Sequence, residues 1–485
     1  MLKFNVSHAL HSVRTPTITQ IPDFTKYSPV RPINEELAPY IYETMKAFPS
    51  KSHYINQQHY YHNDIVLIND YLKKKPTPVS LTQLAQYYDD STTLTKQKLI
   101  SSAKFVKEEL AIRMAHKIHA LQMLPFNVVN NFHFVQVYES YYNIFERFRK
   151  FPAIHTLDDS IRFTKFTREI LKDFNTLNLP HLIMGALECT TLDLYPTDKM
   201  DELLSDLLRA RISRRLIVEE HISIADNYFS GKKRNTLVLG DIFQECSAKK
   251  YLLEASKTSE KFIKDMYFES MPMPELIING ATDLNFYFLP SHLKYLLGEI
   301  LRNTYEATIK DYIRKGLDKP EPIVVTIIKN DESYLFRVCD KAGGIINHDA
   351  AMNIWSFGKT KAQAAQSLSN FHKLPGLQTV SLYDHLYSGT KSNSPINKPY
   401  INTSLEPMAH YNLKDVVPGY EVPLLKLLKR SFRYKLGIGL AMCKVYAEYW
   451  NGDLTLHSIH GFGTDTVLKL GNLMKHTKEL QLDRV

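Results

Sequence analysis

The chain has 485 residues, of which 44% are hydrophobic and 23% charged, the composition of a globular protein rather than of a disordered or fibrous one. Lysine and arginine outnumber aspartate and glutamate by 60 to 51, a net charge of +9, yet they form no dense basic block of the kind that binds nucleic acid. No apolar run approaches the length of a membrane span, and the chain length favours two or three domains.

The first twenty residues, MLKFNVSHALHSVRTPTITQ, carry Lys3 and Arg14, several serines and threonines, and no acid before Asp23. Their apolar residues are interspersed with polar ones instead of forming a continuous block. This composition is typical of a mitochondrial transit peptide and not of a secretory signal. We therefore expect a transit peptide over residues 1–22, with a disordered tail as the alternative.

Residues 35–230 have a helical pattern. Apolar side chains recur at steps of three and four, and prolines interrupt the pattern at 125, 152 and 180. Two runs show it best: Phe105, Val106, Leu110, Met114, Ile118 and Leu121; and Leu203, Leu204, Leu207, Leu208, Ile212 and Leu216. Long amphipathic helices with short breaks predict a helical bundle of the four-helix type.

Residues 236–475 have a mixed pattern that predicts an α/β domain. Two pairs of β-branched and aromatic runs predict hairpins, at 322–329 with 333–340 and at 453–459 with 464–470. Helical stretches accompany them at 291–315 and 438–450. The polar, turn-rich residues 361–430 fit neither element and form a long insertion, which is typical of a functional lid or a disordered segment.

The four cysteines, Cys189, Cys246, Cys339 and Cys443, lie far apart and form no CxxC pair. This spacing argues against a disulfide framework or a zinc knuckle and fits a reducing compartment.

Four short motifs occur in order within the α/β part. Glu299 and Asn303 are one helical turn apart and share a face. The others are DKAGGI after a strand (340–345), KLGIGLA before a helix (435–441) and GFGTD at the start of a strand (461–465). Each alone is a weak signal, because a Gly-x-Gly before a helix usually makes only a tight turn. Their order resembles the Bergerat-fold superfamily of ATPases and kinases, in which an α/β sandwich binds ATP.

Each motif has a physical role in such a site. Glycine backbone N–H groups at a helix N-terminus can approach phosphate oxygens, and Asp340 can accept a hydrogen bond from the adenine amino group. Asn303 can offer Mg²⁺ an oxygen ligand, and Glu299 can deprotonate the attacking hydroxyl.

The resemblance becomes narrower over longer stretches. PSHLKYLLGEILRNTYEAT (290–308) and YAEYWNGDLTLHSIHGFGTDTVLKL (446–470) are similar to the mitochondrial pyruvate dehydrogenase kinase and branched-chain 2-oxoacid dehydrogenase kinase family. EELAIRMAHKIHALQMLP (108–125) and RARISRRLIVEEH (209–221) are similar to the regulatory bundle of that family. The similarity spans roughly residues 80–472.

This resemblance implies a protein serine kinase of the mitochondrial matrix that uses ATP and Mg²⁺. It implies that the kinase inactivates the dehydrogenase α subunit of the pyruvate dehydrogenase complex, docks on the lipoyl domain of the acyltransferase core, and forms a homodimer or a heterodimer with a related kinase. Glu299 is the implied catalytic base and Asn303 the metal ligand. The implied nucleotide-binding residues are Arg302, Asn303, Asp340, Gly344, Thr360, Lys435, Leu436, Gly437, Ile438, Gly439, Leu440 and Thr464.

Several positions depart from the family. Tyr295 and Asn175 stand where histidines are usual, Glu306 where an arginine is usual, and Ala342 where a glycine is usual. Arg302 replaces a lysine, and the chain ends without the family's Asp-Trp tail. These changes affect regulation and turnover more than the core reaction.

Other readings remain open. The substrate could be the branched-chain dehydrogenase, and a nucleotide-binding scaffold without transfer activity fits the replaced Tyr295 and Glu306. A histidine kinase is disfavoured because His116, His119 and His181 lack the acid and proline that follow a phosphoacceptor histidine. A DNA-mismatch or topoisomerase-type ATPase is disfavoured because a helical bundle precedes the ATP domain.

Overall fold

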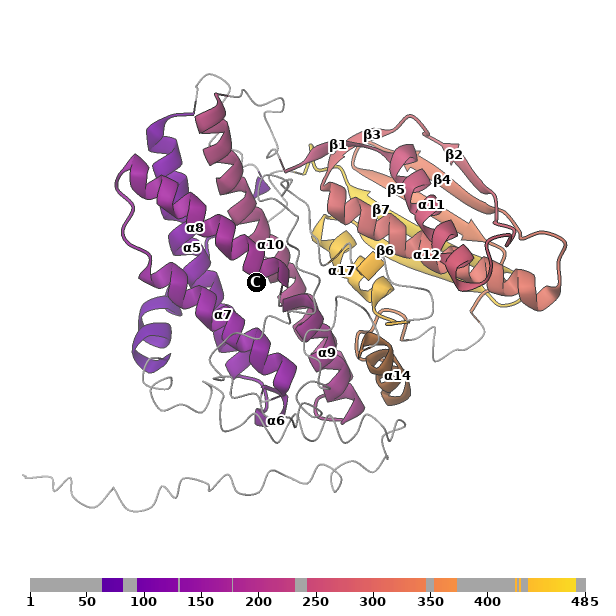
Figure 1. Cartoon of the computed structure of the whole chain (residues 1–485), viewed down its shortest axis with the longest axis horizontal. Coiled ribbons are helices and arrows are strands. Elements are labelled where there is room, and N and C mark those ends of the chain that lie inside the picture. The colour runs from indigo at the N-terminus through magenta and orange to yellow at the C-terminus, as the bar shows by residue number, and fades with distance from the viewer. Residues whose placement is uncertain are drawn as a thin grey trace, which may run out of the picture.

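The computed structural model describes residues 63–81, 94–129, 131–176, 178–231, 242–345, 353–372, 424, 427–428 and 435–476. The expected transit peptide and most of the expected insertion lie outside these residues. Figure 1 shows a helical half beside a half that contains the sheet. The predicted combination of helices with a mixed α/β part is thereby confirmed.

The helical half consists of a π-helix and six α-helices among the described residues. They are η2 (Asn63–Tyr71), α5 (Lys96–Gln122), α6 (Phe126–Val129), α7 (Phe132–Lys150), α8 (Leu157–Thr176), α9 (Asn178–Thr191) and α10 (Thr197–Ser230). Side-chain caps begin two of the long helices: Thr95 accepts the Lys98 N–H before α5, and Asn131 accepts the His133 N–H before α7. Gly231 ends α10 in the left-handed conformation that favours glycine.

Helix α5 packs on α7, α8 and α10, and α9 packs on α7, so the long helices form a layered bundle (Figure 1). The two apolar runs noted in the sequence face the core, where only Phe105 and Leu203 are less than fully buried. The break expected near Pro180 lies between α8, which ends at Thr176, and α9, which begins at Asn178. Pro180 itself lies in the first turn of α9, where a residue without an N–H leaves no helical hydrogen bond unmade.

The other half contains two sheets. A small one pairs β1 (Gln244–Ser247) with β3 (Asn285–Phe288). The larger has the order β2-β4-β5-β7-β6. Its strands are β2 (Leu276–Gly280), β4 (Ile323–Lys329), β5 (Ser333–Asp340), β6 (Asp453–Ile459) and β7 (Gly463–Gly471). Both predicted hairpins, β4–β5 and β6–β7, are antiparallel as expected, and β2 adds to β4 in parallel.

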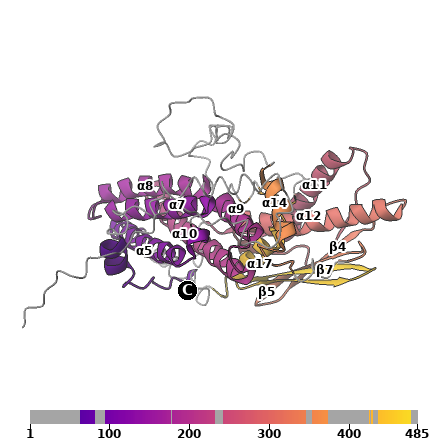
Figure 2. The same cartoon turned by 90° about the horizontal axis from the view of Figure 1, so that it is seen from below.

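Three helices cover one face of this sheet: α11 (Ala248–Met266), α12 (Pro290–Lys315) and α17 (Gly439–Tyr449). Figure 2 shows them above the strands, which gives two layers. Helix α12 packs on β5 and α11, and α17 packs on α12, β6 and β7. A further helix, α14 (Lys361–His372), packs on α9 of the helical half.

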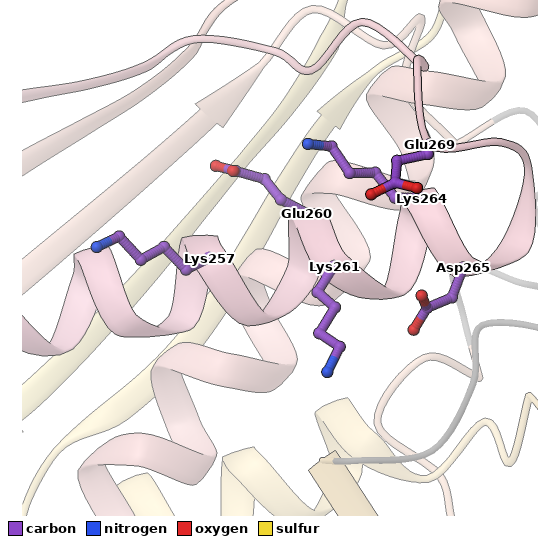
Figure 3. A pocket seen from close by; sticks show the side chains of 6 residues that line it. All are labelled: Lys257, Glu260, Lys261, Lys264, Asp265 and Glu269. Atoms are coloured by element: carbon purple, nitrogen blue, oxygen red, sulfur yellow. The ribbon is translucent and has the colours of Figure 1, made fainter.

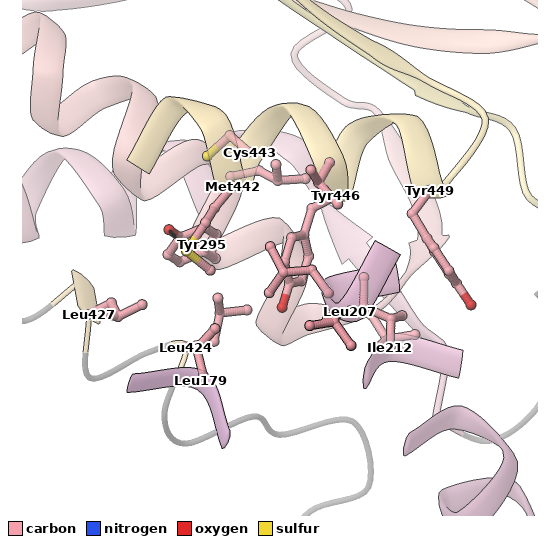
Figure 4. Packing of buried hydrophobic residues seen from close by; sticks show 14 of the residues in the cluster. Leu179, Leu207, Ile212, Tyr295, Leu424, Leu427, Met442, Cys443, Tyr446 and Tyr449 are labelled. Atoms are coloured by element: carbon pink, nitrogen blue, oxygen red, sulfur yellow. Dashed lines mark hydrogen bonds between the residues drawn. The ribbon is translucent and has the colours of Figure 1, made fainter. Parts of the chain in front are cut away.

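One apolar core runs through both halves. Figure 4 shows Tyr446 of α17 directed toward Leu207 and Ile212 of α10, with Tyr449 one turn further along on the same side of α17. Beyond them the buried Trp450 donates its Nε1 hydrogen to His292 Nδ1 over 2.9 Å. Burial, with Arg215 and Arg211 nearby, holds the pKa of His292 well below its usual value, so the neutral ring is the acceptor.

All four cysteines are free, as their spacing predicted. No helix in the described part of the chain is long and apolar enough to cross a membrane.

We predict that Trp450→Ala lowers the free energy of unfolding by about 3–5 kcal/mol, because it leaves a cavity at the junction and strands the His292 acceptor. Ile313→Ala is the control, since the Ile313 side chain is 48% exposed on α12 and its loss should change stability by less than about 0.5 kcal/mol. Urea denaturation followed by circular dichroism measures both. Similar midpoints and slopes for the two variants would contradict the packing at this junction.

Candidate functional site

The site is organised by the contact between Glu299 and the first residue of α17. Glu299 is fully buried on α12. A Cβ atom at Gly439 would lie only 2.0 Å from Glu299 Oε2, so no other residue fits there without displacing the carboxylate. The structure thus brings together two predicted site residues from motifs that are far apart in the sequence.

Asn303 follows Glu299 by one turn of α12, and its side chain is exposed. An exposed carboxamide beside a buried carboxylate suits one oxygen ligand of a Mg²⁺ ion whose other ligands are water and phosphate. No cluster of three or more metal-binding side chains occurs in the described residues.

The side chain of Arg302 is buried, whereas that of its neighbour Asn303 is exposed. The Arg302 guanidinium is 5.6 Å from the centroid of the Phe262 ring on α11, and it lines a hollow there with Gly298 and Leu428. The structure therefore places Arg302 in the α11–α12 interface, away from the exposed position of Asn303.

The predicted phosphate loop, 435–440, leads into α17. Leu436 and Ile438 are buried and anchor it, while Gly437 has a left-handed φ of 69°. The N–H of Met442 makes the first helical hydrogen bond, to Ile438 O over 2.9 Å. The N–H groups of the residues between, Leu440 among them, have no intrahelical acceptor and can bind an anion.

Asp340 ends β5 opposite Thr464 of β7. Its Oδ1 accepts the N–H of Ala342 over 3.0 Å and the N–H of Thr464 over 3.2 Å. Burial raises the pKa of the Asp340 carboxyl above its usual value, although these two hydrogen bonds oppose the shift. One side-chain oxygen thus fixes the turn, which leaves Oδ2 as the acceptor for a ligand.

The turn after Asp340 is held against the β6–β7 hairpin. Gly343 exchanges hydrogen bonds with Gly461 and Phe462, at 2.8 and 3.2 Å. A Cβ at Gly344, whose φ is 69°, would lie 2.4 Å from Ile459 O. Gly344 is therefore required for this close approach of the turn to Ile459 at the end of β6.

Glu306, which the sequence marked as unusual, forms a cluster of charges. It pairs with Lys435 over 2.7 Å and with Lys310 over 2.5 Å. Burial alone would raise the pKa of Glu306, but the hydrogen bonds from Lys310 and Lys435 outweigh it and hold that pKa below its usual value. The carboxylate at this position is thus neutralised from within the chain.

Sequence reasoning missed the anchoring of residues 353–360 on the helical half. Asp201 Oδ1 on α10 accepts the N–H groups of Phe357 and Gly358 over 2.8 and 3.2 Å. A Cβ at Gly358 would lie 2.9 Å from Thr190 Oγ1 and from Thr197 Cγ2. We call residues 353–360 the docking segment. No motif could have revealed it, because an aspartate in the first turns of a helix is common.

The docking segment leads into α14, and Thr360 begins that helix. Thr360 and Gln363 exchange backbone-to-side-chain hydrogen bonds of 3.3 Å, a capping box. At the other end of α14, Asn370 Nδ2 donates to Lys435 O over 2.9 Å. Helix α14 thus links Thr360, at its start, to Lys435, at the start of the phosphate loop.

A separate hollow lies between α11 and the segment that follows it (Figure 3). Its lining side chains carry charges of both signs: Lys257, Glu260, Lys261, Lys264, Asp265 and Glu269. None is a predicted site residue, and a mixed-charge helix face of this kind is typical of solvent-exposed surface.

Comparison with known proteins identifies relatives over the whole chain. A protein of Saccharomyces cerevisiae, "[Pyruvate dehydrogenase (acetyl-transferring)] kinase 2, mitochondrial", is 72% identical over 482 residues, which cover 98% of both chains. The human "[Pyruvate dehydrogenase (acetyl-transferring)] kinase isozyme 4, mitochondrial" is 23% identical over 427 residues, or 85% of both chains. Residues 78–243 also match a family profile described as "Mitochondrial branched-chain alpha-ketoacid dehydrogenase kinase".

We predict that the Glu299–Gly439 contact appears in a double-mutant cycle. Gly439→Ala alone should lower the free energy of unfolding by about 1–3 kcal/mol, because the added methyl collides with the carboxylate. In the Glu299→Ala background the collision is absent, and the same change should cost at least about 0.5 kcal/mol less. Gly439 does not have a left-handed φ, so alanine brings no backbone strain there. Equal costs in the two backgrounds would show that the two residues are not in contact.

Proposed function

The chain belongs to the mitochondrial pyruvate dehydrogenase kinase family, and we propose that it is an ATP-dependent protein serine kinase that phosphorylates and inactivates the dehydrogenase α subunit of the pyruvate dehydrogenase complex. The observation that carries this proposal is the 72% identity that extends over 98% of both chains. The match to the branched-chain kinase profile covers only residues 78–243, so it supports the shared family and leaves pyruvate dehydrogenase the first choice of substrate.

In the proposed mechanism Glu299 accepts the proton of the substrate serine as its oxygen attacks the transferred phosphoryl group. Its burial and its contact with Gly439 hold the carboxylate at the start of α17. A base fixed in this way adds little to nucleotide affinity but positions the acceptor hydroxyl. ATP supplies the phosphoryl group, and the free N–H groups of α17 bind its phosphate chain.

The adenine end of the proposed site is the region around Asp340, Gly344 and Thr464, where the end of β5 meets the start of β7. Asp340 Oδ2 accepts a hydrogen bond from the adenine amino group, and the Thr464 hydroxyl adds a polar contact. Asn303 would hold Mg²⁺ through its side-chain oxygen, and the metal would neutralise charge on the phosphate chain. Thr360, Lys435, Leu436, Gly437, Ile438 and Leu440 complete the site by their position around the phosphate loop. Arg302, which precedes Asn303 on α12, is also a proposed nucleotide-binding residue.

The remaining parts of the proposal follow from family membership. The two-layer domain over 236–475 is a Bergerat-fold ATP-binding domain, with residues 361–430 as its lid insertion. The bundle over 35–230 docks the kinase on the lipoyl domain of the acyltransferase core and mediates regulation. The kinase functions in the mitochondrial matrix, directed there by residues 1–22, as a homodimer or a heterodimer with a related kinase.

The test of this function uses purified components. We expect the kinase to transfer phosphate from ATP to serine of the pyruvate dehydrogenase α subunit, faster with the lipoyl-bearing core present, because the core raises the local substrate concentration. Glu299→Gln should lower the rate about 10²–10⁴-fold while nucleotide affinity stays within a few-fold. Transfer to the branched-chain dehydrogenase alone would replace the substrate assignment. Near-normal transfer by Glu299→Gln would remove Glu299 as the base.

We further predict that Asn303→Ala weakens nucleotide binding only when Mg²⁺ is present. The variant loses one oxygen ligand, which water replaces without holding the metal to the protein. Calorimetric titration of ATP with Mg²⁺ and with a chelator separates the two conditions. The exposed Asn279, on β2, supplies a matched Asn→Ala control. A variant at position 303 whose Mg²⁺ dependence equals that of the wild type would exclude the metal-ligand role.

A further inference from the structure

The ammonium group of Lys359 lies against the phosphate loop. A Cβ at Gly437 would be 2.3 Å from Lys359 Nζ and 3.0 Å from its Cε. Two residues further along, Gly439 is in contact with Glu299. The short stretch Gly437-Ile438-Gly439 therefore has a cation at one end and the proposed catalytic base at the other.

This ammonium has no anionic partner among the described residues, whereas the lysines around it do. Lys435 and Lys310 pair with Glu306, and Lys361 pairs with Asp193 over 2.6 Å. Burial, together with the nearby Lys435, lowers the pKa of Lys359 from its usual value to about 8. Holding a partly desolvated ammonium beside glycine N–H groups, without an anion, is unfavourable for the free protein.

The backbone holds Lys359 in this position from the side of the helical half. Its φ is +56°, a left-handed value that is uncommon for a residue with a side chain. Its N–H donates to Ser356 Oγ over 3.0 Å, and the preceding Gly358 is bound to Asp201 of α10. A strained backbone that presents an unpaired cation to a glycine loop points to a binding role.

We propose that Lys359 binds the phosphate chain of the nucleotide, in a lysine–phosphate contact that adds to the N–H groups of the phosphate loop. This inference rests on the proposed ATP-dependent function and names a residue beyond those that the motifs identified. The ligand chemistry is a di- or triphosphate, because the cation is at Gly437, on the phosphate loop, and a nucleoside monophosphate would offer less charge there. Asp201 is a positioning residue, since it acts through the docking segment.

The test measures binding of ADP, ATP and AMP to the full-length protein by calorimetry, without the dehydrogenase. Lys359→Gln should weaken ADP and ATP binding roughly 10-fold or more, the usual size of a charge-assisted contact, and leave AMP binding nearly unchanged. Lys359→Arg keeps a cation and should restore most of the affinity. Lys361→Gln removes an equal charge two residues away, but its ammonium is already paired with Asp193, so its nucleotide affinities should match the wild type.

The outcomes separate this inference from the proposed function. If the wild type binds ADP and Lys359→Gln binds it equally well, Lys359 is not a phosphate ligand and the kinase assignment stands. If the wild type binds no adenine nucleotide, the proposed function itself fails. Equal weakening of AMP and ADP in Lys359→Gln would overturn the inference as well, because it would indicate damage to the whole site. Thermal melting without nucleotide confirms that each variant is folded.

Discussion

The architecture of the site depends on the absence of one atom, the Cβ at position 439. Because Gly439 has no side chain, α17 begins directly against the buried carboxylate of Glu299 on α12. That approach fixes where the phosphate loop runs, and with it the positions of Gly437 and Lys359. It also sets the line of α17 across the sheet, so that Tyr446 and Tyr449 reach the helical half.

The helical half packs against the sheet-containing half and also supplies residues that hold part of the proposed site. Asp201 of α10 and Thr190 of α9 hold the docking segment from one side, and the phosphate loop meets the same segment from the other. Because the apolar core is continuous through both halves, these contacts rest on a rigid base. The proposed nucleotide site is therefore assembled from both halves of the structure.

Much of this could be predicted from the sequence. The hairpin β4–β5 was visible from alternating runs around Asn330, whose side chain accepts the N–H of Ser333 over 2.6 Å in the turn. The motif order located Glu299 and the glycine loop.

The parallel pairing of β2 with β4 was not predicted, because no local pattern specifies a partner distant in sequence. The anchoring of the docking segment could not be predicted either, because Asp201 binds backbone N–H groups, which are present in any sequence. The contact of Arg302 with the Phe262 ring could not be predicted either, because it depends on how α11 packs on α12.

The hydrogen bond from Asn370 to Lys435 brings the two ends of the insertion together. The two segments that this hydrogen bond joins are also held by other contacts: α14 packs on α9, and the phosphate loop leads into Gly439, which contacts Glu299. The free energy of closing such a loop varies only with the logarithm of its length, so halving or doubling the intervening chain changes it by about 0.6 kcal/mol. Changes in the length of the chain between His372 and Leu424 therefore cost little loop-closure free energy. The end of that stretch is constrained, because Leu424 and Leu427 are buried in the apolar core.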